Sequence, residues 1–379
     1  MRQFYLSIML IFLVLSEMFA ATRDTSRGSW GLQARQAYGF VIAHRPALEL
    51  LQERHLLGAE LSIVKTSSGE KEWHSGFLFP DVGINISYFD LGAPKILGYG
   101  IVVYPYVNFP LSDKSDWRTH FRYGMGLGYV EKIFDAEENI KNSAIGSHIN
   151  GVMHFDFHFE KDLGKRTYFE IGAGITHYSN GSTAIPNLGL NIAHVSAGIM
   201  HYFGQKTAIK KETRPAYIED NEWRIYLAGS EKKIRPPGGQ KYQVGVLSVS
   251  RMRNLNYKSS LGAGIDLFYD NSLQQRSLRE GNPDADETYN FRPGIYGAFQ
   301  LNVGRIGFNF NTGFYPYTRW KGDGNVYSRI GLRYYMKNLF LCMNLKSHFA
   351  RADFIEWGAG IRFKKLKNNS SGKKYINEN

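Results

Sequence analysis

The chain has 379 residues, 43% of them hydrophobic, and a formal net charge of +12. Beyond the first 20 residues no run of about 18 apolar residues occurs, which excludes helical membrane spans, and the single cysteine, Cys342, excludes an intrachain disulfide framework. Glycine (40 residues), Tyr (24) and Phe (25) are abundant, which in strand-length alternation is typical of a transmembrane β-barrel. An array of soluble β-sandwiches is the alternative.

The first 20 residues predict a secretory signal peptide. An arginine opens the segment, residues 5–15 are apolar, and Ala20 and Ala21 are small enough for cleavage, although Met18 and Phe19 fit the cleavage pattern less well. No cysteine follows that would carry a lipid anchor. We therefore expect the mature chain to be exported from the cytoplasm.

Sixteen strand-like runs, each bounded by turn residues, follow the signal. They are expected to begin near Gln36, Leu57, Asp81, Lys95, Trp117, Ile145, Arg166, Leu190, Glu222, Gln240, Asn256, Tyr289, Arg305, Val326, Leu339 and Phe354. The predicted fold is all-β, a transmembrane antiparallel β-barrel with about 16 strands in one barrel. The alternative is an eight-stranded barrel plus a second eight-stranded half.

The only linker-like change of composition lies at residues 205–221, which divide the strands into a first half, 21–204, and a second half, 222–364. Both halves end in an aromatic strand terminus, Phe203 and Phe363, of the kind that closes outer-membrane barrels. Two barrels in one chain would be rare, so the single barrel is favoured. The tail, 365–379, has no apolar pattern and is expected to be disordered.

The connections between the predicted strands alternate in length. If the N-terminus is periplasmic, the odd-numbered connections are outside and are mostly the longer ones, as in outer-membrane barrels. Two inner segments, 66–80 and 205–221, break the rule. This orientation places the connection 181–189 at the extracellular rim.

Residues 166–204 form two alternating runs joined by a loop of Gly, Ser, Thr, Pro and Asn. Because neighbouring side chains of a strand point to opposite faces, one face of the first run is apolar until it ends in His177 and Ser179. Same-face Cβ atoms two residues apart are roughly 7 Å apart, so the two side chains could touch. Asn191 falls on the matching outward face of the next strand.

The run Gly172–Asn180, with its His-Tyr-Ser-Asn, followed by Pro186, Asn187 and Gly189, resembles the lipid A 3-O-deacylases (PagL type) of bacterial outer membranes, an acyloxyacyl hydrolase family. The resemblance is best over residues 166–204, looser over the preceding strands, and not visible in the second half. It implies an eight-stranded barrel that hydrolyses an ester-linked acyl chain of lipid A. It also implies that His and Ser lie on the lipid-facing wall and that no metal or cofactor takes part.

The resemblance assigns roles residue by residue. Ser179 is then the nucleophile, His177 the general base, and Asn180, through its side chain or backbone N–H, the oxyanion donor. The family places a Glu where this chain has Asn191, and Asn can hold a histidine tautomer but cannot stabilise imidazolium by charge. Glu170 cannot replace that Glu, because it lies inward and far down the strand.

The second half contains a similar-looking set of polar residues, His348, Asp353 and Glu356. The parity of the last two strands turns His348 and Glu356 inward, so we expect a buried network inside the barrel rather than a second site. No nucleic-acid, nucleotide or Cys/His metal motif is found in the sequence.

The sequence thus predicts a carboxylic ester hydrolase in the outer membrane of a Gram-negative bacterium, acting on lipid A (lipopolysaccharide) or a related glycolipid. Its basic residues would meet lipid phosphates, or simply form a solvated rim. One rival is a non-catalytic barrel, a pore, transporter or structural protein with a degenerate site. Another is an adhesin that binds through the connection 271–288.

Overall fold

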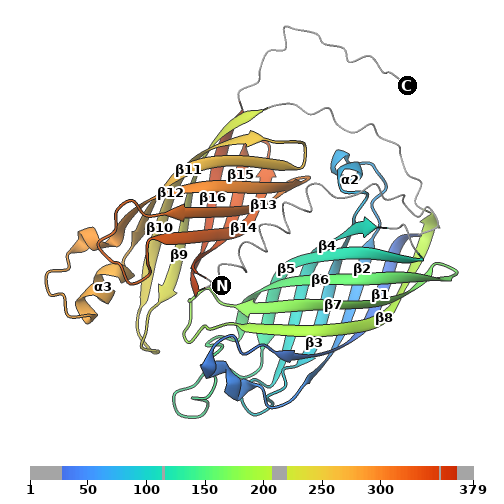
Figure 1. Cartoon of the computed structure of the whole chain (residues 1–379), viewed down its shortest axis with the longest axis horizontal. Helices are drawn as coiled ribbons and strands as arrows, with labels where there is room; N and C mark the ends of the chain where they lie inside the picture. The colour runs from blue at the N-terminus through green and yellow to red at the C-terminus, as the bar shows by residue number, and fades with distance from the viewer. Residues whose placement is uncertain (1–27, 113–115, 207–219, 350, 365–379) are drawn as a thin grey trace, which may run out of the picture.

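The computed structural model describes residues 28–112, 116–206, 220–349 and 351–364, and these form two β-barrels (Figure 1). The predicted signal peptide, most of the predicted linker and the predicted disordered tail lie outside the described residues. Sixteen antiparallel strands run through the described part of the chain, which confirms the predicted number and the all-β class.

The strands of the first barrel are β1 Gly28–Val41, β2 Leu56–Lys65, β3 Asp81–Asp90, β4 Tyr99–Ser112, β5 Trp117–Val130, β6 Ile149–Gly164, β7 Thr167–Ser179 and β8 Leu190–Lys206. Those of the second barrel are β9 Asn221–Lys233, β10 Lys241–Asn254, β11 Ser259–Asp270, β12 Phe291–Val303, β13 Ile306–Phe314, β14 Val326–Met336, β15 Leu339–His348 and β16 Arg351–Lys364. Most begin within a few residues of the predicted starts; β1 begins eight residues before Gln36.

Each group of eight strands closes on itself. β8 pairs back to β1, with Ala34 opposite Ile199, and β16 pairs back to β9, with Ile225 opposite Ile361. The prediction of one sixteen-stranded barrel is therefore wrong, and the alternative of two eight-stranded halves is confirmed. Closure of β8 on β1 pairs both free edges of the first eight strands, so β9–β16 must pair their own two edges with each other.

The connections contain four short helical segments: η1 Pro46–Leu51, α2 Glu72–Gly76, α3 Ser272–Arg279 and η2 Glu287–Asn290. No helix in the described residues has the length and apolar character needed to cross a membrane. The segment that carries α2 joins β2 to β3 and is the long inner connection that the sequence marked as an exception. The other described inner connections are short, whereas α3 and η2 lie in the longest outer one.

Side chains alternate between an apolar outside and a polar inside, as the parity predicted. Ile171, Ile175 and Val195 are exposed on the outer wall, whereas Glu170 is fully buried inside. The first lumen is filled rather than open, with Arg35 forming ion pairs to Glu60 at 2.6 Å and to Asp156 at 3.2 Å. Eight strands enclose an interior that side chains can fill, and this one is filled.

The second lumen contains the polar network that the sequence predicted. Glu356 accepts a hydrogen bond from Asn344 Nδ2 at 2.6 Å and lies 3.3 Å from Arg329 Nη1. Asp353 lies 2.7 Å from Lys346 Nζ, and His348 lies 3.7 Å from Asp353. All six side chains are buried, so these residues hold the barrel interior together.

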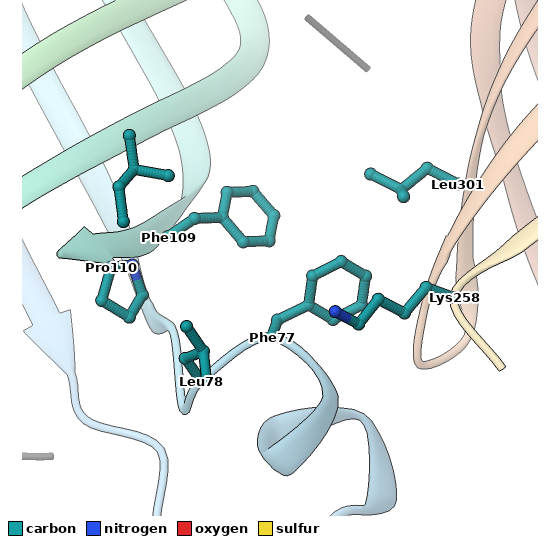
Figure 2. Close-up of a pocket in the computed structure, with 7 residues that line it drawn as sticks. Phe77, Leu78, Phe109, Pro110, Lys258 and Leu301 are labelled. Atoms are coloured by element: carbon teal, nitrogen blue, oxygen red, sulfur yellow. The ribbon is translucent and has the colours of Figure 1, made fainter. Parts of the chain in front are cut away.

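The two barrels touch through an apolar cluster near the barrel ends that carry the shortest connections. Tyr123 of β5 and Phe308 of β13 approach to 5.0 Å between ring centroids, and the outward-facing Phe121 and Leu301 are each only 2% exposed because the other barrel covers them. Beside the cluster is a small pocket lined by Phe77, Leu78, Phe109, Pro110, Leu111, Lys258 and Leu301 (Figure 2). Its volume of about 20 Å³ has room for about one water molecule, so this pocket is too small to hold a lipid.

Candidate functional site

His177 and Ser179 lie at the C-terminal end of β7, and their side chains are on the outward face of the barrel. His177 is directly opposite Asn191 of β8, and Ser179 is opposite Gly151 of β6. Directly paired residues of antiparallel strands share a face with Cβ atoms about 5 Å apart, so the predicted parity of all three candidates is correct. Ser179 is 6% exposed and His177 is half-buried.

A directional chain of hydrogen bonds orients the His177 ring. His177 Nδ1 donates to Asn191 Oδ1 at 2.7 Å, and Asn191 Nδ2 in turn donates to His44 Nδ1 at 3.0 Å. His44 lies in the connection after β1, and its Nε2 donates to the Leu188 carbonyl at 3.1 Å. One consistent set of donors and acceptors therefore places the proton of neutral His177 on Nδ1 and leaves Nε2 with a lone pair.

Ser179 is held by Asn187, not by His177. Asn187 Nδ2 donates to Ser179 Oγ at 3.1 Å, and Asn187 Oδ1 accepts from the Asn180 backbone N–H at 3.1 Å. Within the described residues no hydrogen bond joins Ser179 to His177. His177 and Ser179 thus lie on the same face of β7, at the same end of the strand, but their side chains are not hydrogen-bonded to each other.

Asn180 supports the loop that follows Ser179. Its side-chain Nδ2 donates to Ser147 Oγ at 2.9 Å, and its carbonyl accepts from the Thr183 hydroxyl at 3.0 Å. The next backbone N–H, that of Gly181, donates to Ser179 Oγ at 3.3 Å. Both donors expected of Asn180 are thus engaged with protein groups, while Gly181 N–H and Asn187 Nδ2 point at the Ser179 oxygen.

The second barrel also contacts this loop. The Lys233 backbone N–H, at the end of β9, donates to the Ser182 carbonyl at 2.7 Å, and Ser182 Oγ donates to the Ala352 carbonyl of β16 at 3.4 Å. A Cβ added to Gly181 would lie 3.0 Å from the Ile355 backbone nitrogen and closer still to its side chain. The loop after Ser179 is therefore held between the two barrels.

This arrangement can support acyl transfer. A hydroxyl, an imidazole with a free lone pair, and two N–H donors aimed at the hydroxyl lie on one apolar wall, next to a surface of exposed Ile and Val side chains. No group of His, Cys, Asp or Glu near Ser179 meets the geometry of a metal site among the described residues; the two groups that do lie inside the first barrel.

The structure adds residues that sequence reasoning missed. Asn187 was noticed only as part of a loop motif, and nothing in the pattern indicated that its amide would reach back to Ser179. His44 lies 133 residues before His177, and only the closure of β1 against β8 brings it to Asn191. Ile355 belongs to the other barrel and carries no local signal at all.

Two family models match the chain, one over each barrel. The model described as lipid A 3-O-deacylase (PagL) matches residues 57–200, and the model described as acyloxyacyl hydrolase, C-terminal domain, matches residues 221–365. The second match extends the resemblance through the half of the chain in which the sequence alone showed none.

Likeness to solved structures is weak in overall superposition. Two engineered variants of the Rhodopseudomonas blastica porin align at 8% identity over 88% of this chain and 99% of theirs, with a TM-score of 0.17. CdiB from Acinetobacter baumannii aligns at 9% identity over 89% of this chain and 60% of its own, also with a TM-score of 0.17. At these scores the alignments carry no argument. No curated protein matches the chain.

Proposed function

The chain belongs to the family of PagL-type lipid A 3-O-deacylases and acyloxyacyl hydrolases, and from that membership we propose that it is an outer-membrane serine esterase. It removes an ester-linked acyl chain from lipid A or a related glycolipid. The observation that carries the proposal is the oriented His177, with its Nε2 lone pair free, on the same outward face as the Ser179 hydroxyl.

The reaction follows the serine-esterase pattern. Ser179 Oγ attacks the ester carbonyl carbon while His177 Nε2 takes the hydroxyl proton, which requires a rotation that brings the two side chains into contact. The tetrahedral intermediate then expels the sugar hydroxyl, which takes that proton from His177. A water molecule, deprotonated by His177, hydrolyses the acyl-serine and releases the fatty acid. Asn191 keeps the His177 proton on Nδ1 throughout.

The oxyanion of the intermediate needs donors near Ser179 Oγ. Asn187 Nδ2 at 3.1 Å and the Gly181 backbone N–H at 3.3 Å are suitably placed, and we assign them this role. Asn180, which the sequence nominated, contributes its backbone N–H once Asn187 turns toward the substrate. Its side chain holds the loop through Ser147.

The location and substrate follow from the same surface. A closed barrel with an apolar outer wall suits a membrane, and a site on that wall meets a lipid that never leaves the bilayer. The predicted signal peptide and the family both support the outer membrane of a Gram-negative bacterium. Basic residues on the outer connections, such as Arg45 and Lys132, are available to lipid A phosphates.

A second candidate is a non-catalytic barrel with a degenerate site. Two points favour it: Asn191 stands where the resemblance to the family implies a Glu, and the hydrogen bond between Ser179 and His177 is not formed. Hydrogen bonds of a catalytic site are often long without substrate, so the second observation weighs less than the first.

The deciding experiment is mass spectrometry of lipid A from cells that express the wild type, Ser179→Ala or His177→Ala. We expect the wild type to release one ester-linked acyl chain and both variants to leave lipid A intact. His201→Ala is the matched control, because His201 is exposed on β8 at the far end of the wall. Unchanged lipid A in every strain, with folded protein in the membrane, would refute the deacylase and favour the non-catalytic barrel.

A further inference from the structure

The Asn191 side chain has two chemically different ends, and only one of them suits the proposed reaction. With Oδ1 toward His177, at 2.7 Å, the amide accepts from Nδ1–H and leaves Nε2 with its lone pair. If the amide were turned end for end, its NH₂ group would face His177 Nδ1 and would favour the proton on Nε2. A ring with its proton on Nε2 cannot take the proton of Ser179. The two orientations of an amide have almost the same shape, so a group beyond Asn191 must select one of them.

A carboxylate at this position would need no such selection, because both of its oxygens accept hydrogen bonds. The resemblance to the family implies a Glu where this chain has Asn191. In a serine-protease triad, replacement of the carboxylate by an amide costs about 10⁴-fold in kcat, because the histidine then takes the wrong tautomer. An active site with Asn at this position therefore requires a neighbour that fixes the orientation of the amide.

His44 meets the other end of the Asn191 amide. Its Nδ1 lies 3.0 Å from Asn191 Nδ2, and it is the one hydrogen-bond partner of that NH₂ group among the described residues. His44 Nε2 lies 3.1 Å from the Leu188 carbonyl oxygen, which can only accept, so Nε2 carries the proton and Nδ1 of the neutral ring has a lone pair. A lone pair accepts from an NH₂ group and repels a carbonyl oxygen. Neutral His44 therefore selects the orientation of Asn191 that suits His177.

The backbone fixes the group that orients the His44 ring. The carbonyl of Leu188 and the N–H of Gly189 belong to one peptide unit, and this N–H donates to the Ala144 carbonyl at 3.1 Å. The Leu188 side chain packs against the core of the first barrel. A backbone carbonyl, unlike an amide side chain, cannot exchange its ends. The proton positions along the whole chain of hydrogen bonds are therefore determined from Leu188.

A second carbonyl, that of Ile42, lies 3.4 Å from His44 Nδ1. A neutral ring cannot donate to both carbonyls. A proton on Nδ1 would leave Nε2 and the Leu188 oxygen, two acceptors, facing each other at 3.1 Å, whereas a proton on Nε2 makes the shorter bond and leaves Nδ1 to Asn191. The arrangement with the proton on Nε2 is thus the one that satisfies the ring and the amide together.

The hydrogen bonds of this chain also point in one direction. In both Asn191 and His44 the acceptor atom is on the side toward His177 and the donor is on the side away from it. Hydrogen bonds in series polarise one another, and the negative ends of these dipoles stabilise the positive charge that His177 gains during the reaction. The aligned pair therefore supplies part of the stabilisation that a Glu would supply by its charge.

We propose that His44 is a positioning residue of the esterase, which selects the orientation of the Asn191 amide and thereby the tautomer of His177 with a free Nε2. His44 acts through Asn191 and takes no proton from Ser179. Its effect on the rate rests on the proposed function. The tautomer of His177 is a property of the folded barrel and can be measured without any substrate.

The first test is a two-bond ¹H–¹⁵N spectrum of the refolded full-length protein, labelled with ¹⁵N-histidine, in detergent micelles at alkaline pH. Such a spectrum shows which nitrogen of a neutral ring carries the proton, and the signal that is lost in His177→Gln assigns His177. We expect the proton on Nδ1 in the wild type and a shift toward Nε2 in His44→Ala. His44→Asp should keep the proton on Nδ1, because its carboxylate can only accept from Asn191 Nδ2.

The second test is steady-state deacylation of lipid A in mixed micelles. His44→Ala should lower kcat about tenfold with little change in KM, the factor that one net hydrogen bond supplies. His44→Asp should retain most of the wild-type kcat. In the Asn191→Glu background His44→Ala should leave kcat almost unchanged, because a carboxylate presents an acceptor whichever way it turns. His55→Ala is the matched control, since His55 is exposed in the same connection and stacks on Tyr38.

Folding of each variant is checked by the different gel mobility of heated and unheated barrel. A wild type with the His177 proton on Nε2 would overturn the proposal, whatever the variants do. So would a His44→Ala variant with the wild-type tautomer and kcat, an equal loss of kcat in both backgrounds, or a His44→Asp variant as impaired as His44→Ala. If no protein, the wild type included, deacylates lipid A, the proposed function fails and the spectra alone decide the role of His44.

Discussion

Ile355 of the second barrel lies where a side chain on Gly181 of the first barrel would have to go. Gly181 has φ +60°, and it follows Asn180 and Ser179 in the loop that carries the proposed nucleophile. The two barrels therefore meet at the site itself, and the second barrel acts as the wall that fixes this loop.

Gly181→Ala should lower the rate of deacylation about tenfold or more, while the barrels still fold. Alanine is disfavoured by about 1–2 kcal/mol in the left-handed region, and its Cβ also meets Ile355. The double variant with Ile355→Ala should regain part of the loss. Gly238→Ala is the control, because Gly238 has φ +85° with nothing within 4 Å. Equal losses in both single variants would show that Ile355 is irrelevant.

Asn191→Glu should raise the deacylation rate by tenfold or more. A carboxylate would accept the same hydrogen bond from His177 Nδ1 and would also stabilise imidazolium by charge, an effect worth about 10⁴-fold in a serine-protease triad. Asn191→Ala should lower the rate, since the ring orientation is lost. Steady-state assays on lipid A in mixed micelles measure both. A glutamate variant no faster than the wild type would mean that His177 is not the base.

Asn187→Ala should reduce kcat by about 10²–10³-fold with little change in KM. Loss of one oxyanion donor costs about 3–4 kcal/mol in the transition state only, and Asn187 Nδ2 is the side-chain donor nearest to Ser179 Oγ. Asn325→Ala, an exposed loop position of the second barrel, is the matched substitution. A rise in KM with unchanged kcat would assign Asn187 to substrate binding instead.

Neither barrel should conduct ions. Both lumens are filled by buried Arg, Tyr and carboxylate side chains, of which Arg122 and Arg329 are completely enclosed. Eight strands leave no aqueous channel, whereas sixteen in one barrel would have done so. Planar bilayers with the reconstituted protein should show no current steps beyond those of the detergent control. Stable single-channel currents would support the alternative function of a pore.

Acid should loosen the outer loops of the second barrel through Asp323. Burial and nearby Asp353 push its pKa upward, but Arg276, His348 and Arg292 more than offset them, so the pKa is well below the ordinary value. A depressed carboxylate pKa stabilises the fold above about pH 4 and loses that contribution as the pH falls further. Limited proteolysis with pepsin should cut these loops faster below pH 4. At neutral pH, Asp323→Asn should expose them to trypsin.

Much of the site was determined by the sequence itself. Alternation is a local property of a strand, so residues 166–204 were enough to place His177, Ser179 and Asn191 on one outward face and Glu170 inside. The paired aromatic ends, Phe203 and Phe363, were a correct sign of two barrels, although the rarity of such chains argued the other way. The same alternation along the strand predicted that His348 and Glu356 point into the second barrel, and both are buried there.

Only the tertiary structure decided how the strands close and what surrounds the nucleophile. The alternation of β8 and β9 is identical whether they pair with each other or with β1 and β16, because pairing depends on which distant edges meet. That closure brings His44 to Asn191, and the packing of one barrel on the other brings Ile355 to Gly181. The two-residue alternation of a strand specifies which face of the sheet a side chain is on. It does not specify which distant residues pack against that face.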